Sequence, residues 1–190
     1  MIQIFAIIAL ACLANAQVPM TESCPEVTVQ QAFSVPDYLG KWYENQAYPA
    51  IFELTGKCIS AEYTLREDGK VGVLNRQINR LTGSESTVEG YATSDPNEPA
   101  KLTVVFPRMP KKKADSEDNS NYWVLSTDYK SYSVVWSCSN LTEGGSVRFL
   151  WILTRERVVS EEVVQTAYDV LDKFGISKSY LRKTIQTGCD

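Results

Sequence analysis

The chain has 190 residues and a formal net charge of −4, and it contains no histidine. A net acidic chain lacks the basic face that nucleic acids select, so nucleic acid is not an expected partner. Without histidine, the Ser-His and Cys-His pairs of hydrolases, histidine-ligated haem and the usual zinc sites are excluded. Nothing in the spacing of the plentiful acids suggests a catalytic pair, so we expect neither an enzyme nor a metal site.

An uncharged apolar run opens the sequence and ends in Ala14-Asn15-Ala16, a small-x-small cleavage site. The pattern predicts a secretory signal peptide over residues 1–16, although its start carries no Lys or Arg. Residues 17–190 then make a single domain of ordinary length. No later run approaches the roughly 20 apolar residues of a membrane-spanning helix. We therefore expect a secreted, extracellular protein.

Four cysteines follow the predicted signal peptide: Cys24, Cys58, Cys138 and Cys189. An even number in a secreted chain predicts two disulfides, and the spacing leaves all three pairings open. With every thiol bonded, no thiolate nucleophile would remain.

An arm over residues 17–37, including a loop-like Val35-Pro36-Asp37, precedes a series of segments with alternating apolar residues. Turn signals such as Asp68-Gly69 separate these segments, a pattern typical of an antiparallel all-β barrel. The predicted strands cover residues 40–47, 59–65, 71–79, 87–93, 101–106, 122–127, 131–138 and 147–154.

One helix is predicted after the last strand, from about Ser160 to Phe174. Ser160 suits the N-cap position, and apolar side chains then recur at helical spacing. Gly175 suits the position that ends a helix. The apolar face predicts that this helix packs on the outside of the barrel.

The longest irregular stretch covers residues 107–121. Its Lys111-Lys112-Lys113 run is followed by three acidic residues, so we expect a solvated loop with opposed charges. A docking patch is the alternative interpretation.

Two residues are candidates for chemical modification. Asn140-Leu141-Thr142 is an N-glycosylation acceptor in the turn between the last two strands. Met109 lies between prolines after the fifth strand, which predicts an accessible thioether that is readily oxidised to the sulfoxide. Such a residue could give a carrier a protective role by reducing lipid hydroperoxides, whereas the simpler interpretation is a methionine that caps apolar surface.

Three short motifs follow one another in a characteristic order: Gly40-x-Trp42, then Thr127-Asp128-Tyr129, then Arg155 at the end of a late apolar strand. An arginine stacked on a tryptophan face is a cation–π pair, worth ~2 kcal/mol when desolvated. In this order the motifs resemble the three signatures of the lipocalin family. Stretches such as 88–92 and 122–129 resemble its apolipoprotein D branch, which includes the insect Lazarillo-like lipocalins and the insecticyanins.

The resemblance implies an eight-stranded antiparallel up-and-down barrel with one C-terminal helix packed on its outside. It implies the disulfides Cys24–Cys138 and Cys58–Cys189. It also implies that the three motifs close the barrel floor and bind nothing. The residues implied to line a ligand cavity are Tyr63, Asn75 and Trp151.

Strand alternation extends this set of cavity residues. If Arg155 faces inward at the floor, Trp151 and Phe149 face inward too, and Val73 shares a face with Asn75. The interior of an eight-stranded barrel is just wide enough for one small ligand.

We therefore expect a carrier of a small hydrophobic ligand, such as a lipid, fatty acid, sterol, retinoid or bilin, with no other cofactor. The alternative is a protective or protein-interaction module that acts through its loops. A membrane or lipoprotein surface, or a receptor, is a further candidate partner. A monomer or weak oligomer is expected.

Overall fold

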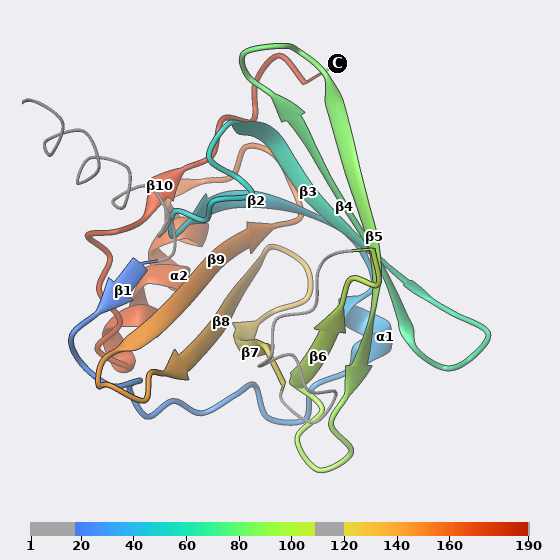
Figure 1. The fold of residues 1–190 in the computed structure, drawn as a ribbon. Coiled ribbons are helices and arrows are strands. Elements are labelled where there is room, and N and C mark those ends of the chain that lie inside the picture. The colour runs from blue at the N-terminus through green and yellow to red at the C-terminus, as the bar shows by residue number, and fades with distance from the viewer. Residues whose placement is uncertain (1–17, 109–119, 190) are drawn as a thin grey trace, which may run out of the picture.

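Strands β2 to β9 close into an eight-stranded antiparallel barrel in the computed structural model, which describes residues 18–108 and 120–189 (Figure 1). Each strand pairs with its neighbour in the sequence, and pairing of β2 with β9 completes the barrel. The strands are β2 (Gly40–Ala47), β3 (Gly56–Leu65), β4 (Val71–Asn79), β5 (Glu85–Ser94), β6 (Lys101–Val105), β7 (Tyr122–Thr127), β8 (Tyr132–Asn140) and β9 (Ser146–Thr154). The predicted fold class is confirmed, and the largest difference in a strand boundary is at the start of β3.

Three short elements were not predicted: β1 (Val18–Met20), α1 (Val35–Tyr38) and β10 (Arg182–Lys183). The predicted loop at residues 35–37 is instead the helical turn α1, because Pro36 fits the first turn and the Ser34 hydroxyl accepts a hydrogen bond from the Asp37 N–H. β1 and β10 are too short for alternation to be visible. They pair with β9 and β2, respectively.

Helix α2 (Glu161–Lys173) lies outside the barrel (Figure 1). Its buried residues are Ala167 and Leu171. Gly175 has a φ of 62° and follows the helix as predicted, while the Ile176 N–H donates to the Leu171 carbonyl. Ser160 occupies the N-cap, but its side chain makes no capping hydrogen bond, contrary to the expected role of the hydroxyl.

A second apolar layer lies between α2 and the outer face of the barrel. Trp136 pairs with Leu150, and Val134 with Ile152, and all four side chains are fully buried. Tyr48 packs edge-on against Trp136, and its hydroxyl donates to the carbonyl of Ser177 just after the helix. The helix packs against β8 and β7. Leu150 and Ile152 on the outer face of β9 are buried in the same layer, so β9 is apolar on both sides.

Two disulfides attach the ends of the described chain to the barrel. Cys24 is bonded to Cys138 on β8, and Cys58 on β3 is bonded to Cys189. This is the pairing that the family resemblance implied.

The segment that leads to Cys189 also forms part of the barrel wall. The Thr184 N–H donates to the Asn45 carbonyl, and the Cys58 N–H donates to the Ile185 carbonyl. The Gln186 side chain donates to carbonyls of both β2 and β3. β2 and β3 pair directly only over residues 40–43 of β2, so residues 182–186 fill the gap between their upper halves.

The barrel floor is built around Trp42 and Arg155. Trp42 is fully buried, and the Arg155 guanidinium carbon lies 3.8 Å from the centroid of its ring. Nε of Arg155 donates to the Tyr129 carbonyl at 2.9 Å, and Nη1 donates to the Lys41 carbonyl at 2.9 Å. Nη2 reaches the Asp37 carbonyl at 3.2 Å. One side chain thus joins α1, β2 and the β7–β8 turn.

The other motif residues place these carbonyl groups. Gly40 has a φ of +93°, and a Cβ added there would lie 3.3 Å from Nη1 of Arg155. The Asp128 carboxylate accepts hydrogen bonds from the N–H groups of Lys130 and Ser131, and Tyr129 adopts a φ of 66°. This turn directs the Tyr129 carbonyl at Arg155.

We predict that Trp42→Ala lowers the free energy of unfolding by ~3–5 kcal/mol, because it leaves a cavity in a packed layer. Arg155→Ala should cost about 2 kcal/mol through the lost stacking and charge-assisted hydrogen bonds. Urea unfolding measures both. Arg66→Ala is the control, since Arg66 stacks on Tyr91 at the exposed surface, 5.9 Å from the ring centroid. A shift of the Trp42 or Arg155 variant no larger than that of Arg66→Ala would contradict the role of this pair.

Candidate ligand-binding site

The five predicted cavity residues lie on the inner face of the barrel. Tyr63 pairs with Val73, and the next inward pair on the same strands is Ala61 with Asn75. On the far wall, Trp151 and Phe149 have the same parity as Arg155. Alternation predicted this direction for Trp151 and Phe149, whereas the family resemblance implied it for Tyr63 and Asn75.

The structure places these residues at two depths. Tyr63 is opposite Gly40 at the floor and is 7% exposed, and Val73 beside it is 4% exposed. Asn75, Phe149 and Trp151 are only half-buried. The lower pair belongs to a packed layer, whereas the upper three present accessible surface.

Three aromatic rings lead from the mouth of the barrel inward, and we call them the aromatic stack: Phe52, Phe149 and Trp151. The rings of Phe149 and Trp151 are almost parallel, at 2°, with centroids 5.6 Å apart. Phe52, on the loop between β2 and β3, stacks on Phe149 at 6.2 Å and is 50% exposed. A continuous apolar surface thus runs from solvent into the barrel.

Two glutamates lie beside this stack. The Trp151 indole N–H donates to Oε1 of Glu53 at 3.4 Å, and the buried Glu44 accepts a hydrogen bond from the Thr184 hydroxyl. Burial raises the pKa of both carboxyls, and the charge of Glu44 raises the pKa of Glu53 further. The ion pairs formed by residues 18–108 and 120–189 involve neither glutamate.

Neither glutamate was predicted as a site residue from the sequence. Glu44 follows Trp42 by two residues on β2, so alternation already carried a signal for it. Glu53 lies on a loop, and only the fold brings it to Trp151.

Below the aromatic stack, three buried side chains (Tyr63, Tyr38 and Ser133) and the half-buried Tyr122 form what we call the hydroxyl chain. The Tyr63 and Tyr122 hydroxyl oxygens are 2.8 Å apart. Tyr122 to Tyr38, and Tyr38 to Ser133, are each 2.9 Å. Burial raises the pKa of Tyr38 to about 12 and raises those of Tyr63 and Tyr122 as well, so these phenols stay protonated.

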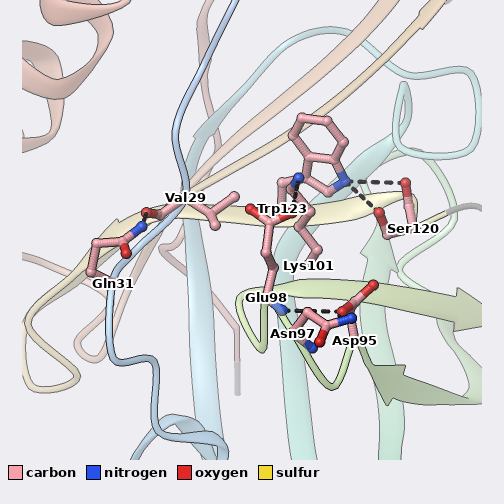
Figure 2. Close-up of polar contacts among 8 residues, drawn as sticks. All are labelled: Val29, Gln31, Asp95, Asn97, Glu98, Lys101, Ser120 and Trp123. Carbon is pink, nitrogen blue, oxygen red and sulfur yellow. Dashed lines mark hydrogen bonds and ion pairs between the residues drawn. The ribbon is translucent and has the colours of Figure 1, made fainter.

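Trp123 shows that not every aromatic strand residue belongs to the interior. Its indole N–H donates to the Ser120 hydroxyl at 2.7 Å, and the Lys101 ammonium lies 4.6 Å from the ring centroid (Figure 2). Lys101 also pairs with Glu98 in the adjacent turn. Because Trp123 pairs with Trp136, it belongs to the outer face.

The predicted glycosylation site, the predicted redox residue and the predicted docking loop are separate from the cavity residues. Asn140 is exposed at the end of β8, and its Oδ1 accepts a hydrogen bond from the Cys24 N–H at 2.7 Å. Met109 and the lysine run at 111–113 lie outside the described residues.

Among residues 18–108 and 120–189, no helix is long and apolar enough to cross a membrane. The same residues contain no group of three or more His, Cys, Asp or Glu side chains placed to share a metal ion.

Comparison with known proteins defines the class of this barrel. The family described as Lipocalin-like domain matches residues 33–186, and the chain belongs to the lipocalin family. Apolipoprotein D of Cavia porcellus is 40% identical over 168 residues, which cover 87% of this chain and 84% of that protein. The resemblance to the apolipoprotein D branch is thereby confirmed.

Two further comparisons extend this picture. The bilin-binding protein of Pieris brassicae is 34% identical over 161 residues, covering 84% of this chain and 82% of that protein. The structure of apocrustacyanin C2 superposes with a TM-score of 0.75 at 18% identity, over 90% of this chain and 92% of that one. At this identity the superposition shows a common fold only.

The buried glutamates predict a distinctive pH dependence of stability. A carboxyl whose pKa is higher in the folded than in the unfolded state stabilises the fold below its unfolded pKa, and this contribution is lost as pH rises through the folded pKa. We expect wild type to lose stability relative to a Glu44→Gln, Glu53→Gln double variant between about pH 4.5 and about pH 9. Denaturant unfolding across this range measures the difference.

The matched control is Glu67→Gln with Glu143→Gln, since both residues are exposed. The control should follow wild type across the range. Parallel pH profiles for wild type and the Glu44, Glu53 variant would contradict the raised pKa values.

Proposed function

We propose that the protein is a secreted carrier that binds a small hydrophobic ligand in the upper half of the barrel. The observation that carries this proposal is the half-buried pair Phe149 and Trp151 on the inner wall, continuous with exposed Phe52 at the mouth. Apolar walls with a few convergent polar groups are typical of small-molecule sites. Here the polar groups would be Asn75 and the two glutamates.

The ligand class is supported by the family and by the chemistry of the walls. The related bilin-binding protein of Pieris brassicae is named for a bilin. A lipid, fatty acid, sterol, retinoid or bilin would each place a long apolar body against the aromatic stack. Tyr63 and Val73 would then shape the bottom of the site, because both are buried below it.

Secretion is supported by the signal-peptide pattern at residues 1–16 and by the two disulfides, which persist in oxidising compartments. Glycosylation at Asn140 is compatible with its exposed position on the last hairpin. We propose a binding role and not catalysis, since the sequence lacks histidine and the four cysteines at 24, 58, 138 and 189 are all bonded.

The protective role suggested by Met109 remains a sequence-based prediction, because that residue lies outside the described ranges. The same holds for a docking role of the 107–121 loop, whose residues 109–119 are not described.

Binding can be tested with retinol as a fluorescent probe of the mature protein. Trp151→Ala should weaken binding about tenfold, which corresponds to ~1.4 kcal/mol of lost contact. It should also remove the largest part of the tryptophan quenching caused by bound retinol.

Trp123→Ala is the matched control, because it removes an indole of the same size from the outer face. This variant should change the retinol affinity less than twofold, on the order of 0.4 kcal/mol. Equal losses in the two variants would place the site outside the barrel.

A further inference from the structure

The hydroxyl chain crosses the interior of the barrel. Tyr63 lies on β3 and Tyr122 on β7, and three strands separate β3 from β7 in either direction around the closed sheet. Their hydroxyls can therefore meet at 2.8 Å only across the interior. A ligand that entered from the mouth and passed Trp151 would meet this chain next.

A count of hydrogen atoms shows that one donor in the chain is uncommitted. Four hydroxyls carry four hydrogens, and three hydrogen bonds link them. Each bond uses one hydrogen, so one hydrogen remains whichever way the chain is directed. Across residues 18–108 and 120–189, none of these hydroxyls donates to any other protein acceptor. A buried hydroxyl without an acceptor costs about 1–3 kcal/mol.

The surroundings limit where the missing acceptor can lie. Ser133, at one end of the chain, is fully buried. The hollow between the tyrosine rings and α1 holds only about 10 Å³, and its walls are almost entirely apolar. Tyr122 is the half-buried member of the chain, and the next inward pair above Tyr63 and Val73 is Ala61 with Asn75. The side of the chain that faces Asn75 and the upper interior is therefore the direction from which an acceptor can approach.

We propose that the ligand presents an acceptor oxygen, such as a carbonyl, at its leading end and that this oxygen takes the uncommitted hydrogen of the hydroxyl chain. The inference rests on the proposed carrier function and narrows it to one ligand chemistry. Tyr63 and Tyr122 become specificity-determining residues, because they face the incoming ligand. A ligand with an oxygen-free leading end would leave a buried donor unpaired, and this cost discriminates against such a ligand.

The test compares three probes that share one polyene: all-trans-retinal, all-trans-retinol and the corresponding oxygen-free hydrocarbon. Wild type should bind retinal and retinol about tenfold more tightly than the hydrocarbon, as expected when a buried donor gains a partner. A Tyr63→Phe, Tyr122→Phe double variant should reduce this preference to less than about twofold while binding the hydrocarbon as well as wild type does. Quenching of tryptophan fluorescence gives all six affinities.

A vibrational measurement reads the hydrogen bond directly. The carbonyl stretch of retinal bound to wild type should lie at lower wavenumber than in a hydrocarbon solvent, and it should move back in the double variant. A role of the tyrosines in packing alone would leave this band unchanged.

The matched control is Tyr132→Phe with Tyr168→Phe, which removes two hydroxyls bonded on the outer side of the barrel, to Ser126 and Gln46. It should retain the full preference for oxygenated probes.

Equal wild-type affinity for retinal and the hydrocarbon would overturn the inference and mean that a water molecule satisfies the donor, while the carrier function would stand. An unchanged preference in the double variant would also overturn it. If none of the three probes binds to wild type, the carrier proposal and the inference both fail.

Discussion

The stacking of Arg155 on Trp42 is the interaction on which the rest of the barrel depends. The guanidinium uses its face for the indole and its N–H groups for the carbonyls of Tyr129, Lys41 and Asp37. A planar cation with several donors can do both at once, which a lysine could not. Because these carbonyls belong to three separate segments, one side chain fixes where α1 lies beneath the strands. Tyr38 belongs to α1, so the position of the hydroxyl chain follows from the same contact.

The interior above this floor is divided by polarity. The lower half holds neutral hydroxyls, and the upper half holds an aromatic stack with two carboxyls whose pKa values are raised by burial. Among residues 18–108 and 120–189, the ion pairs all lie outside these two halves, so this part of the interior avoids the desolvation cost of a buried ion pair. Such a lining favours a long apolar molecule with a polar group at its leading end.

The sequence predicted what depends on local period and missed what depends on closure of the barrel. Alternation located all eight barrel strands and the inward direction of Phe149 and Trp151, because side chains on a strand must alternate. Alternation also places Glu44 on the inner face, two residues after Trp42, but acidic residues are so common in this sequence that Glu44 was not singled out. It could not show that Tyr63 meets Tyr122, since these residues lie on opposite walls and are 59 positions apart. It could not place Glu53 either, because loop residues follow no periodic pattern. It also missed α1, because this helix is a single turn, too short to show a helical period.

The segment at residues 182–186 completes the wall between β2 and β3, and this has a consequence for biosynthesis. Thr184 and Gln186 bond to Glu44, from which they are separated by 140 and 142 positions in the sequence. The early strands therefore emerge from the ribosome long before the segment that covers their exposed edges. During that interval the unpaired upper edge of β2 is a template for association with other chains. Contacts of such long range also slow folding. This edge stays open until residues 182–186 arrive, and the wall between β2 and β3 is complete only from that moment.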